Sequence, residues 1–281
     1  MANGWVVHGA VPAGSTKRAY MLMIRESGFL SAAHAAEKGR RVLDALMLET
    51  LRRGVGIDLG ERTSVPQVTG PVIPNGLSVG EDGPNDGFIW SGGSTSGTVQ
   101  QLEPLVQDIE RSAAEPRTLS PRHRIACELL HAVQFQDGAQ ARFLLAVAAV
   151  EALLELPERD EAARAFVKET LERLAASTLT DDDKASMRGS LRWLYCESIS
   201  RTGKLLSTRL LNGAFFLGLP PDKFFGRIYT IRSRLLHGGD AALSRDEFDL
   251  LAFGTDCFAR SLLAAHINEA QTLEQPPAVH E

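Results

Sequence analysis

One segment near the C-terminal end of the sequence, residues 224–239, carries the side chains best suited to catalysis. Arg232 and His237 lie five residues apart in it. An arginine offers a fork of hydrogen-bond donors that matches a phosphate group, and a histidine can accept and donate protons near neutral pH. The two residue types together therefore suit chemistry on a phosphodiester.

The spacing of Arg232 and His237 sets a geometric condition on that chemistry. On an ideal α-helix, residues five apart point about 140° away from each other. A single helix would therefore hold the pair together poorly. A two-fold dimer that lays two such helix ends side by side would gather four groups in one cleft. The spacing alone recurs by chance in many helices.

Arg232 also interrupts an apolar stripe formed by Phe225, Ile228 and Leu236. A buried guanidinium is costly without a partner, so it must meet a carboxylate, a phosphate or water. Glu151 is the natural partner, because it interrupts an almost wholly apolar run in the same way. This pair could be purely structural, or Glu151 could orient Arg232 for catalysis. Both interpretations stay open.

The remaining cations of the segment have two interpretations as well. Lys223, Arg227 and Arg234 fall on a different face of the same helix. They predict either an RNA-binding groove or a solvated helix face, and Arg201 and Lys204 leave the same choice. For His237, the alternative to catalysis is a simple helix C-cap beside a glycine.

Residues 118–271 contain the helical periods that would position these groups. Ser120 followed by Pro121 is typical of a helix start, two glycines at 238–239 indicate a helix end, and Ser244 with Glu247 fits a capping box. The predicted helices begin at residue 120 and then cover 140–156, 160–176, 178–197, 200–211, 221–237 and 244–270. We expect an all-α bundle followed by a disordered tail over 272–281.

Residues 1–115 differ in character. Short β-type runs at 5–8 and 20–24 precede a helical period over 30–51 that should end near Gly54. Gly, Pro, Ser and Asn are dense over 54–97, with a few further β-type runs. We expect a small α+β domain of unknown role in front of the bundle, and a chain that is mostly α overall.

Three spaced motifs resemble those of HEPN domains, specifically the ApeA-like branch. They are the line Arg232-Ser-Arg-Leu-Leu-His237-Gly-Gly, the run 145–154 (LAVAAVEALL) and Glu197-Ser-Ile-Ser200. The resemblance covers about residues 118–271. It implies a dimerising helical bundle and, in active members, a metal-independent endoribonuclease. The catalytic motif of the family falls on Arg232 and His237, with Ser233 in the polar position after the arginine.

The mechanism that the resemblance implies uses no metal and no cofactor. A ribose 2′-OH attacks the adjacent phosphorus, His237 assists proton transfer, and Arg232 stabilises the developing charge. The products would be a 2′,3′-cyclic phosphate and a 5′-OH end, in a defence or toxin setting. The alternative is a catalytically inactive HEPN module that binds RNA, a nucleotide or a protein partner.

Composition limits the other possibilities. The chain has 281 residues, 30 Lys+Arg against 35 Asp+Glu, and a formal net charge of −5. This charge argues against a general DNA-coating protein but leaves room for a local basic cleft. We expect no specific DNA binding. The longest apolar stretch, 143–150, is too short to span a membrane, and no signal peptide is predicted. Three scattered cysteines suit a reducing compartment with buried thiols and predict no zinc site. We expect a cytoplasmic protein.

Other motifs carry less chemistry. Gly92–Gly97 lacks the spacing of a nucleophile elbow, and Gly54–Gly60 follows a helix rather than the strand a dinucleotide fingerprint requires. The acidic run 181–183 looks like compensation of a helix dipole. The histidines at 8, 34, 123, 131 and 266 are too far apart in sequence to predict a ligand set.

Overall fold

The computed structural model describes residues 4–10, 19–25, 30–57, 102–114, 119–238 and 243–274. The described chain is mostly helical, as the sequence predicts. Its contacts divide it into two compact units, one of Met1–Ala152 with Leu243–Glu281 and the other of Leu153–Ala242. Each unit is described by itself.

The first unit contains β1 (Gly4–Ala10), β2 (Ala19–Arg25), α1 (Ala32–Arg52), α2 (Leu102–Ala114), α3 (Pro121–Val133), α4 (Ala139–Ala152) and α9 (Arg245–Glu274). The second contains α5 (Glu161–Ala175), α6 (Asp181–Arg192), a 3-10 turn at Trp193–Tyr195, α7 (Ile199–Leu210) and α8 (Pro221–Leu236). The two strands form an antiparallel pair in which Val7 lies opposite Leu22.

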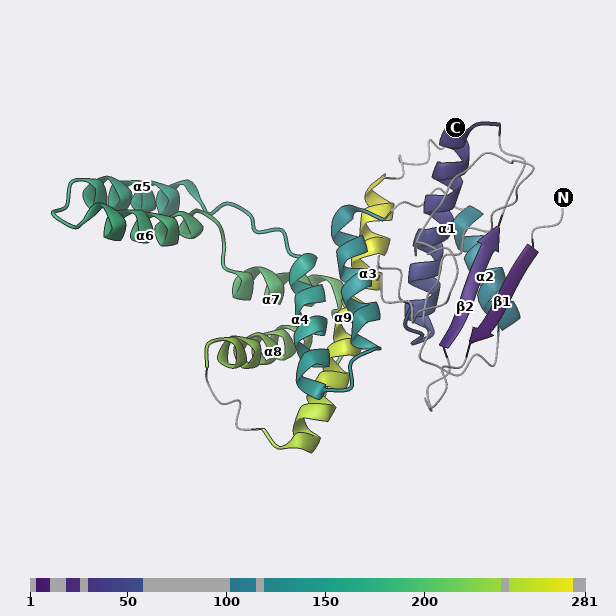
Figure 1. The fold of residues 1–281 in the computed structure, drawn as a ribbon. Coiled ribbons are helices and arrows are strands. Elements are labelled where there is room, and N and C mark those ends of the chain that lie inside the picture. The colour runs from purple at the N-terminus through teal and green to yellow at the C-terminus, as the bar shows by residue number, and fades with distance from the viewer. Residues whose placement is uncertain are drawn as a thin grey trace, which may run out of the picture. The chain divides into compact units, whose positions relative to one another are not determined.

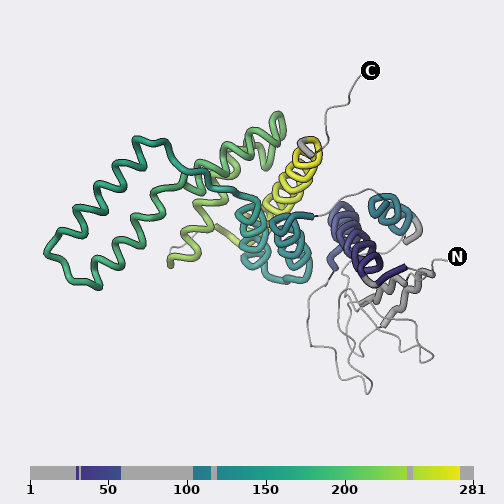
Figure 2. The backbone as a smooth tube through the Cα atoms, turned by 90° about the horizontal axis from the view of Figure 1, so that it is seen from above, coloured from purple at the N-terminus to yellow at the C-terminus, as the bar shows by residue number. Residues whose placement is uncertain are grey.

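Helices α3, α4 and α9 of the first unit lie side by side (Figures 1 and 2). Their facing side chains are fully buried, among them Leu130, Phe143 and Phe258. Helix α1 packs on α2 through a smaller apolar cluster around Leu46 and Ile109. Burial of these side chains is the main force that holds the helices together.

Hydrogen bonds join α1 to α3 and α9. The Leu119 N–H, just before α3, donates to the Asp44 carboxylate over 2.9 Å. Arg260 of α9 donates to the Leu51 carbonyl at the end of α1. Helix α1 therefore belongs to the same compact unit as α3 and α9. This division differs from the predicted separation of 1–115 from 118–271, and the predicted α+β domain stays a prediction.

The second unit consists of two helix pairs, α5 with α6 and α7 with α8 (Figure 1). Helices α7 and α8 approach very closely at Gly203, because a Cβ there would lie 2.1 Å from the Phe225 ring. Phe225 and Ile228 of α8 are fully buried. The α5–α6 pair is anchored at its base, where the Glu197 N–H donates to the Pro157 carbonyl over 2.8 Å.

Most predicted helix starts are confirmed, and several ends are not. Ser120 caps α3, and Ser244 and Glu247 form the predicted capping box. Helix α4 ends at Ala152 rather than at 156, and α6 ends at Arg192, where the chain tightens into a 3-10 turn. The predicted tail from 272 is wrong for its first residues, because α9 continues through Glu274. The β-type runs within 58–97 lie outside the described residues.

Helix α9 is the described helix that is long and apolar enough to cross a membrane by length and composition. Half of the apolar window within residues 245–272 is buried inside the structure. A core helix of a globular protein passes the same test. The packing of α9 against α4 accounts for its apolar character.

Candidate functional site

Helix α8 presents the predicted catalytic pair at its C-terminal end. Two prolines at 220–221 start the helix, since a proline at the first position needs no N–H partner. His237 is the C-cap residue, and its N–H donates to the Ser233 carbonyl over 3.1 Å. Gly238 follows with a φ of +76°, a left-handed conformation that ends the helix. The predicted end of the helix is confirmed.

Within one chain, α8 does not gather the pair. His237 is exposed, whereas Arg232 and Ser233 are partly buried. The predicted stripe is confirmed at Phe225 and Ile228, and it reaches the surface at Leu236, whose exposed fraction is 51%. The difference in exposure agrees with the angle of about 140° between positions 232 and 237. A catalytic site using both side chains would need groups from a second chain.

Glu151 lies partly buried in the last turn of α4, in the first unit, while Arg232 belongs to the second unit. The run around Glu151 is buried at Val147 and Val150, as its apolar composition predicts. The pairing of Glu151 with Arg232 stays a prediction.

The exposed face of α8 is strongly basic. Lys223, Arg227 and Arg234 are all exposed, and on a helical wheel they fall within about 40° of one another. We call these three residues the basic row. His237 falls about 40° to the other side of Lys223, so the row leads to the imidazole, and Arg232 points the opposite way. The described contact that offsets the row is a Lys223–Asp222 ion pair at 3.8 Å, near the limit for such contacts.

The two cations of α7, Lys204 and Arg201, differ in whether they lie near the basic row. Lys204 is exposed and runs along α8 at Gly226, where a Cβ would lie 2.9 Å from the lysine Cε. Its ammonium group therefore lies near the basic row. Arg201 instead forms an ion pair with Glu197 at 3.2 Å, one turn earlier in the chain. The interpretation of Arg201 as part of a solvated helix face fits that contact better than an RNA groove does.

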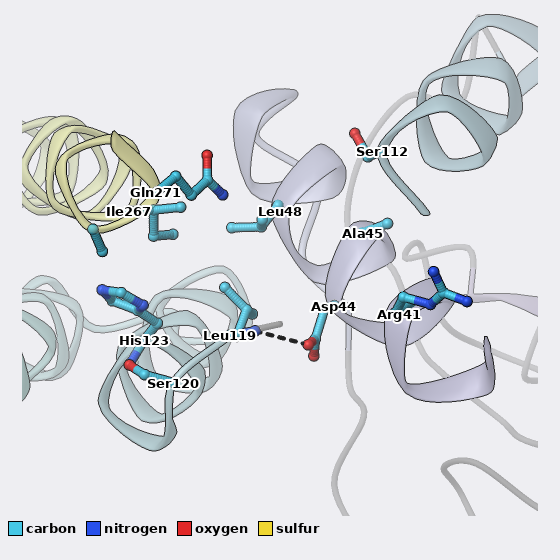
Figure 3. Close-up of a pocket in the computed structure, with 11 residues that line it drawn as sticks. Arg41, Asp44, Ala45, Leu48, Ser112, Leu119, Ser120, His123, Ile267 and Gln271 are labelled. Carbon is cyan, nitrogen blue, oxygen red and sulfur yellow. Dashed lines mark hydrogen bonds between the residues drawn. The ribbon is translucent and has the colours of Figure 1, made fainter. Parts of the chain in front are cut away.

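A pocket in the first unit contains polar residues that sequence reasoning missed (Figure 3). It has a volume of about 70 Å³ and lies between α1 and α2 on one side and the start of α3 and the end of α9 on the other. Asp44, buried at its wall, accepts hydrogen bonds from Leu119 and Arg124. Burial raises the pKa of Asp44, while the Leu119 N–H and Arg124 oppose that change. Both carboxylate oxygens are thus engaged in holding α1 to α3.

Two histidines that lie 143 residues apart in sequence meet beside this pocket. The Nε2 atom of His123 lies 2.9 Å from Nδ1 of His266, with the rings edge to face. Burial, followed by the charge of His266, lowers the pKa of His123 to about 4. His123 and His266 are therefore in contact although they are far apart in sequence. No signal in the sequence reveals it, because it depends on how α3 and α9 pack.

His131 is buried between α3 and the end of α1. Its Nδ1 accepts from the Ile57 N–H over 3.2 Å, so its Nε2 carries the proton and donates to the Met47 carbonyl over 3.1 Å. Burial lowers the pKa of His131 to about 4. Both ring nitrogens are used in the neutral form, which makes His131 a structural residue.

The thiols differ from one another. Cys127 is buried, and burial raises its pKa to about 12, so it is not a nucleophile near neutral pH. Cys196 and Cys257 are only partly buried, which corrects the expectation that all three are buried.

In the part of the chain that the structure describes, no group of three or more His, Cys, Asp or Glu side chains could hold a metal ion.

Comparison with known proteins returns no relative. No family model, no curated protein and no solved structure matches the chain.

Proposed function

We propose that the protein is a metal-independent endoribonuclease of HEPN type, and that the second unit binds RNA along the exposed face of α8. The observation that carries the proposal is the basic row, Lys223, Arg227 and Arg234, which leads along one helix face to the exposed His237. Exposed cations attract the phosphate backbone, and an exposed imidazole at the end of their row is placed to exchange protons with it.

Arg232 enters this mechanism through a second chain. In one chain it points away from His237 by about 140°. In a homodimer that places two α8 helix ends side by side, Arg232 of one chain would stabilise the charge that develops on the phosphate while His237 transfers the proton. Ser233 would support the pair. The 2′-OH of the RNA is the nucleophile.

The test is cleavage of mixed RNAs in EDTA by the wild type and by His237→Ala and Arg232→Ala. The proposal expects cleavage by the wild type and a loss of about 10²-fold or more in each variant, which is the contribution of a general acid–base group for His237 and of a charge-stabilising donor for Arg232. Cleavage that survives both substitutions would remove Arg232 and His237 from the mechanism. The matched control is His34→Ala, which removes an exposed histidine of the first unit.

A second function is favoured by one observation. Arg232 is partly buried and points away from His237, which suits a structural arginine in an inactive module that only binds RNA. Binding and cleavage separate the two functions. If the wild type binds RNA with a strong salt dependence but leaves it intact in both the presence and the absence of Mg²⁺, the binding module is the better description.

A further inference from the structure

A tight apolar turn lies directly before α8. The backbones of Phe216 and Leu219 exchange two hydrogen bonds of 2.9 Å, so Leu217 and Gly218 alone form the tip. Both have positive φ, +47° for Leu217 and +77° for Gly218, as in a type I′ turn. Asparagine is typical of the first tip position, and a leucine there is strained.

Two neighbouring aromatic rings at this turn, those of Phe215 and Phe216, lie in different environments. The Phe216 ring packs on the fully buried Phe224 of α8, with ring centres 5.6 Å apart. The adjacent Phe215 faces solvent, with an exposed fraction of 70%. An aromatic ring this exposed has no part in the core, yet the packing of its neighbour and the closed turn hold its backbone in place.

Phe215 lies at the end of α8 opposite to His237. Helix α8 starts two residues after the turn, and Phe216, the neighbour of Phe215, packs on Phe224 in the first turn of the helix, where Lys223 begins the basic row. The row then runs about 21 Å along the helix to His237. An exposed aromatic ring at one end of a row of cations is the combination that single-stranded nucleic acids bind, because bases stack on the ring while cations follow the phosphates.

From this arrangement we propose that Phe215 is a base-stacking residue, and that the RNA bound along α8 is single-stranded and places one unpaired base on the Phe215 ring. The inference rests on RNA binding by α8, in either form of the proposed function. It adds a specificity-determining residue. A duplex would keep its bases paired and could use the cations but not the ring.

The test measures binding of a fluorescently labelled oligouridylate to the full chain by fluorescence anisotropy. All proteins carry His237→Ala, so that the RNA stays intact. Loss of one stacked base predicts that Phe215→Ala weakens binding about tenfold. Phe215→Trp keeps a ring and should bind like the parent. Phe215→Leu keeps apolar bulk without a π-face and should behave like the alanine variant. Phe253→Ala, which removes a ring of 64% exposure from α9, is the matched control.

A double-stranded RNA of mixed sequence provides the second arm. Its binding should be unchanged by Phe215→Ala and weakened when the basic row is neutralised. The inference is overturned if Phe215→Ala binds the oligouridylate like its parent, or if Phe215→Leu binds it as well as Phe215→Trp does. It is also overturned if Phe215→Ala weakens binding of the duplex as much as binding of the single strand. Because the assay reports binding, it can succeed even if the wild type cleaves no RNA. Failure of the ribonuclease proposal and failure of this inference are therefore distinguishable.

Discussion

Polar side chains serve different purposes in the two compact units. In the first unit, Asp44, His123 and His131 are buried, and their polar atoms are engaged by neighbouring helices. In the second unit, the basic row and His237 lie on the surface of α8. Buried polar groups must find partners inside the protein, whereas exposed ones remain available to a partner outside it. These polar groups of the first unit therefore join its helices, whereas the basic row and His237 of the second unit face solvent.

The largest effect should come from removing His131. In His131→Ala, the buried Ile57 N–H and Met47 carbonyl lose their partner, and a cavity is left. We expect the free energy of unfolding to fall by about 3 kcal/mol, measured by chemical denaturation. The matched substitution His237→Ala, at an exposed position, should change it by less than about 0.5 kcal/mol. Equal losses of unfolding free energy in His131→Ala and His237→Ala would contradict the proposed difference between the buried histidine of the first unit and the exposed histidine of the second.

A comparable effect is expected where α7 meets α8. Gly203→Ala would place a methyl group 2.1 Å from the fully buried Phe225 ring, so the ring or the two helices must shift. We expect a loss of about 2–3 kcal/mol in unfolding free energy. Gly189→Ala in α6 has open space around it and should instead stabilise its helix by up to about 1 kcal/mol. A neutral result for Gly203→Ala would mean that the two helices are not closely packed.

Acid should weaken the contacts of His131 in the first unit. The unfolded chain binds a proton at His131 near the ordinary pKa of 6.5, while the folded protein does so only near 4. The stabilisation is therefore fully present above pH 6.5 and is lost as the pH falls towards 4. Between pH 7 and pH 5, the different pKa of His131 in the folded and unfolded chain lowers the free energy of unfolding by about 2 kcal/mol. His131→Gln should lose that much less stability than the wild type over this interval, and parallel pH profiles would contradict the assignment.

The smallest expected effect concerns the salt dependence of RNA binding. Each phosphate contact to single-stranded RNA contributes about −0.7 to the slope of log affinity against log salt. Neutralising Lys223, Arg227 and Arg234 together should therefore make the slope shallower by about 2. Neutralising Arg201, which already pairs with Glu197, should alter the slope by much less. A triple variant with the parental slope would show that the RNA does not follow α8.

Local signals in the sequence predicted the helices well. The caps at Ser120 and Ser244 and the break at Gly238 depend on neighbouring residues alone, so they could be placed in advance. The helix ends that were predicted at the wrong residue also reflect local structure, such as the 3-10 turn that follows Arg192 at the end of α6. Helix α2 was not predicted.

Contacts across the fold could not be predicted in the same way. The 2.9 Å approach of His123 to His266 depends on the packing of α3 against α9. The position of α1 against α3 depends on the buried Asp44, which looks like any other helical acid in the sequence. For the candidate site, helical periodicity correctly separated Arg232 from the basic row. It could not reveal the turn that exposes Phe215.

The most direct test of the central claim uses an RNA in which a single 2′-OH is removed. The claim is that α8 presents His237 to a phosphodiester that is attacked by its own neighbouring 2′-OH. After a cleaved bond is mapped in EDTA, the same RNA is made with one 2′-deoxynucleotide on the 5′ side of that bond. The account predicts that cleavage stops at that bond alone and that the unmodified RNA yields 2′,3′-cyclic phosphate ends. Unchanged cleavage of the deoxy-substituted bond would contradict it.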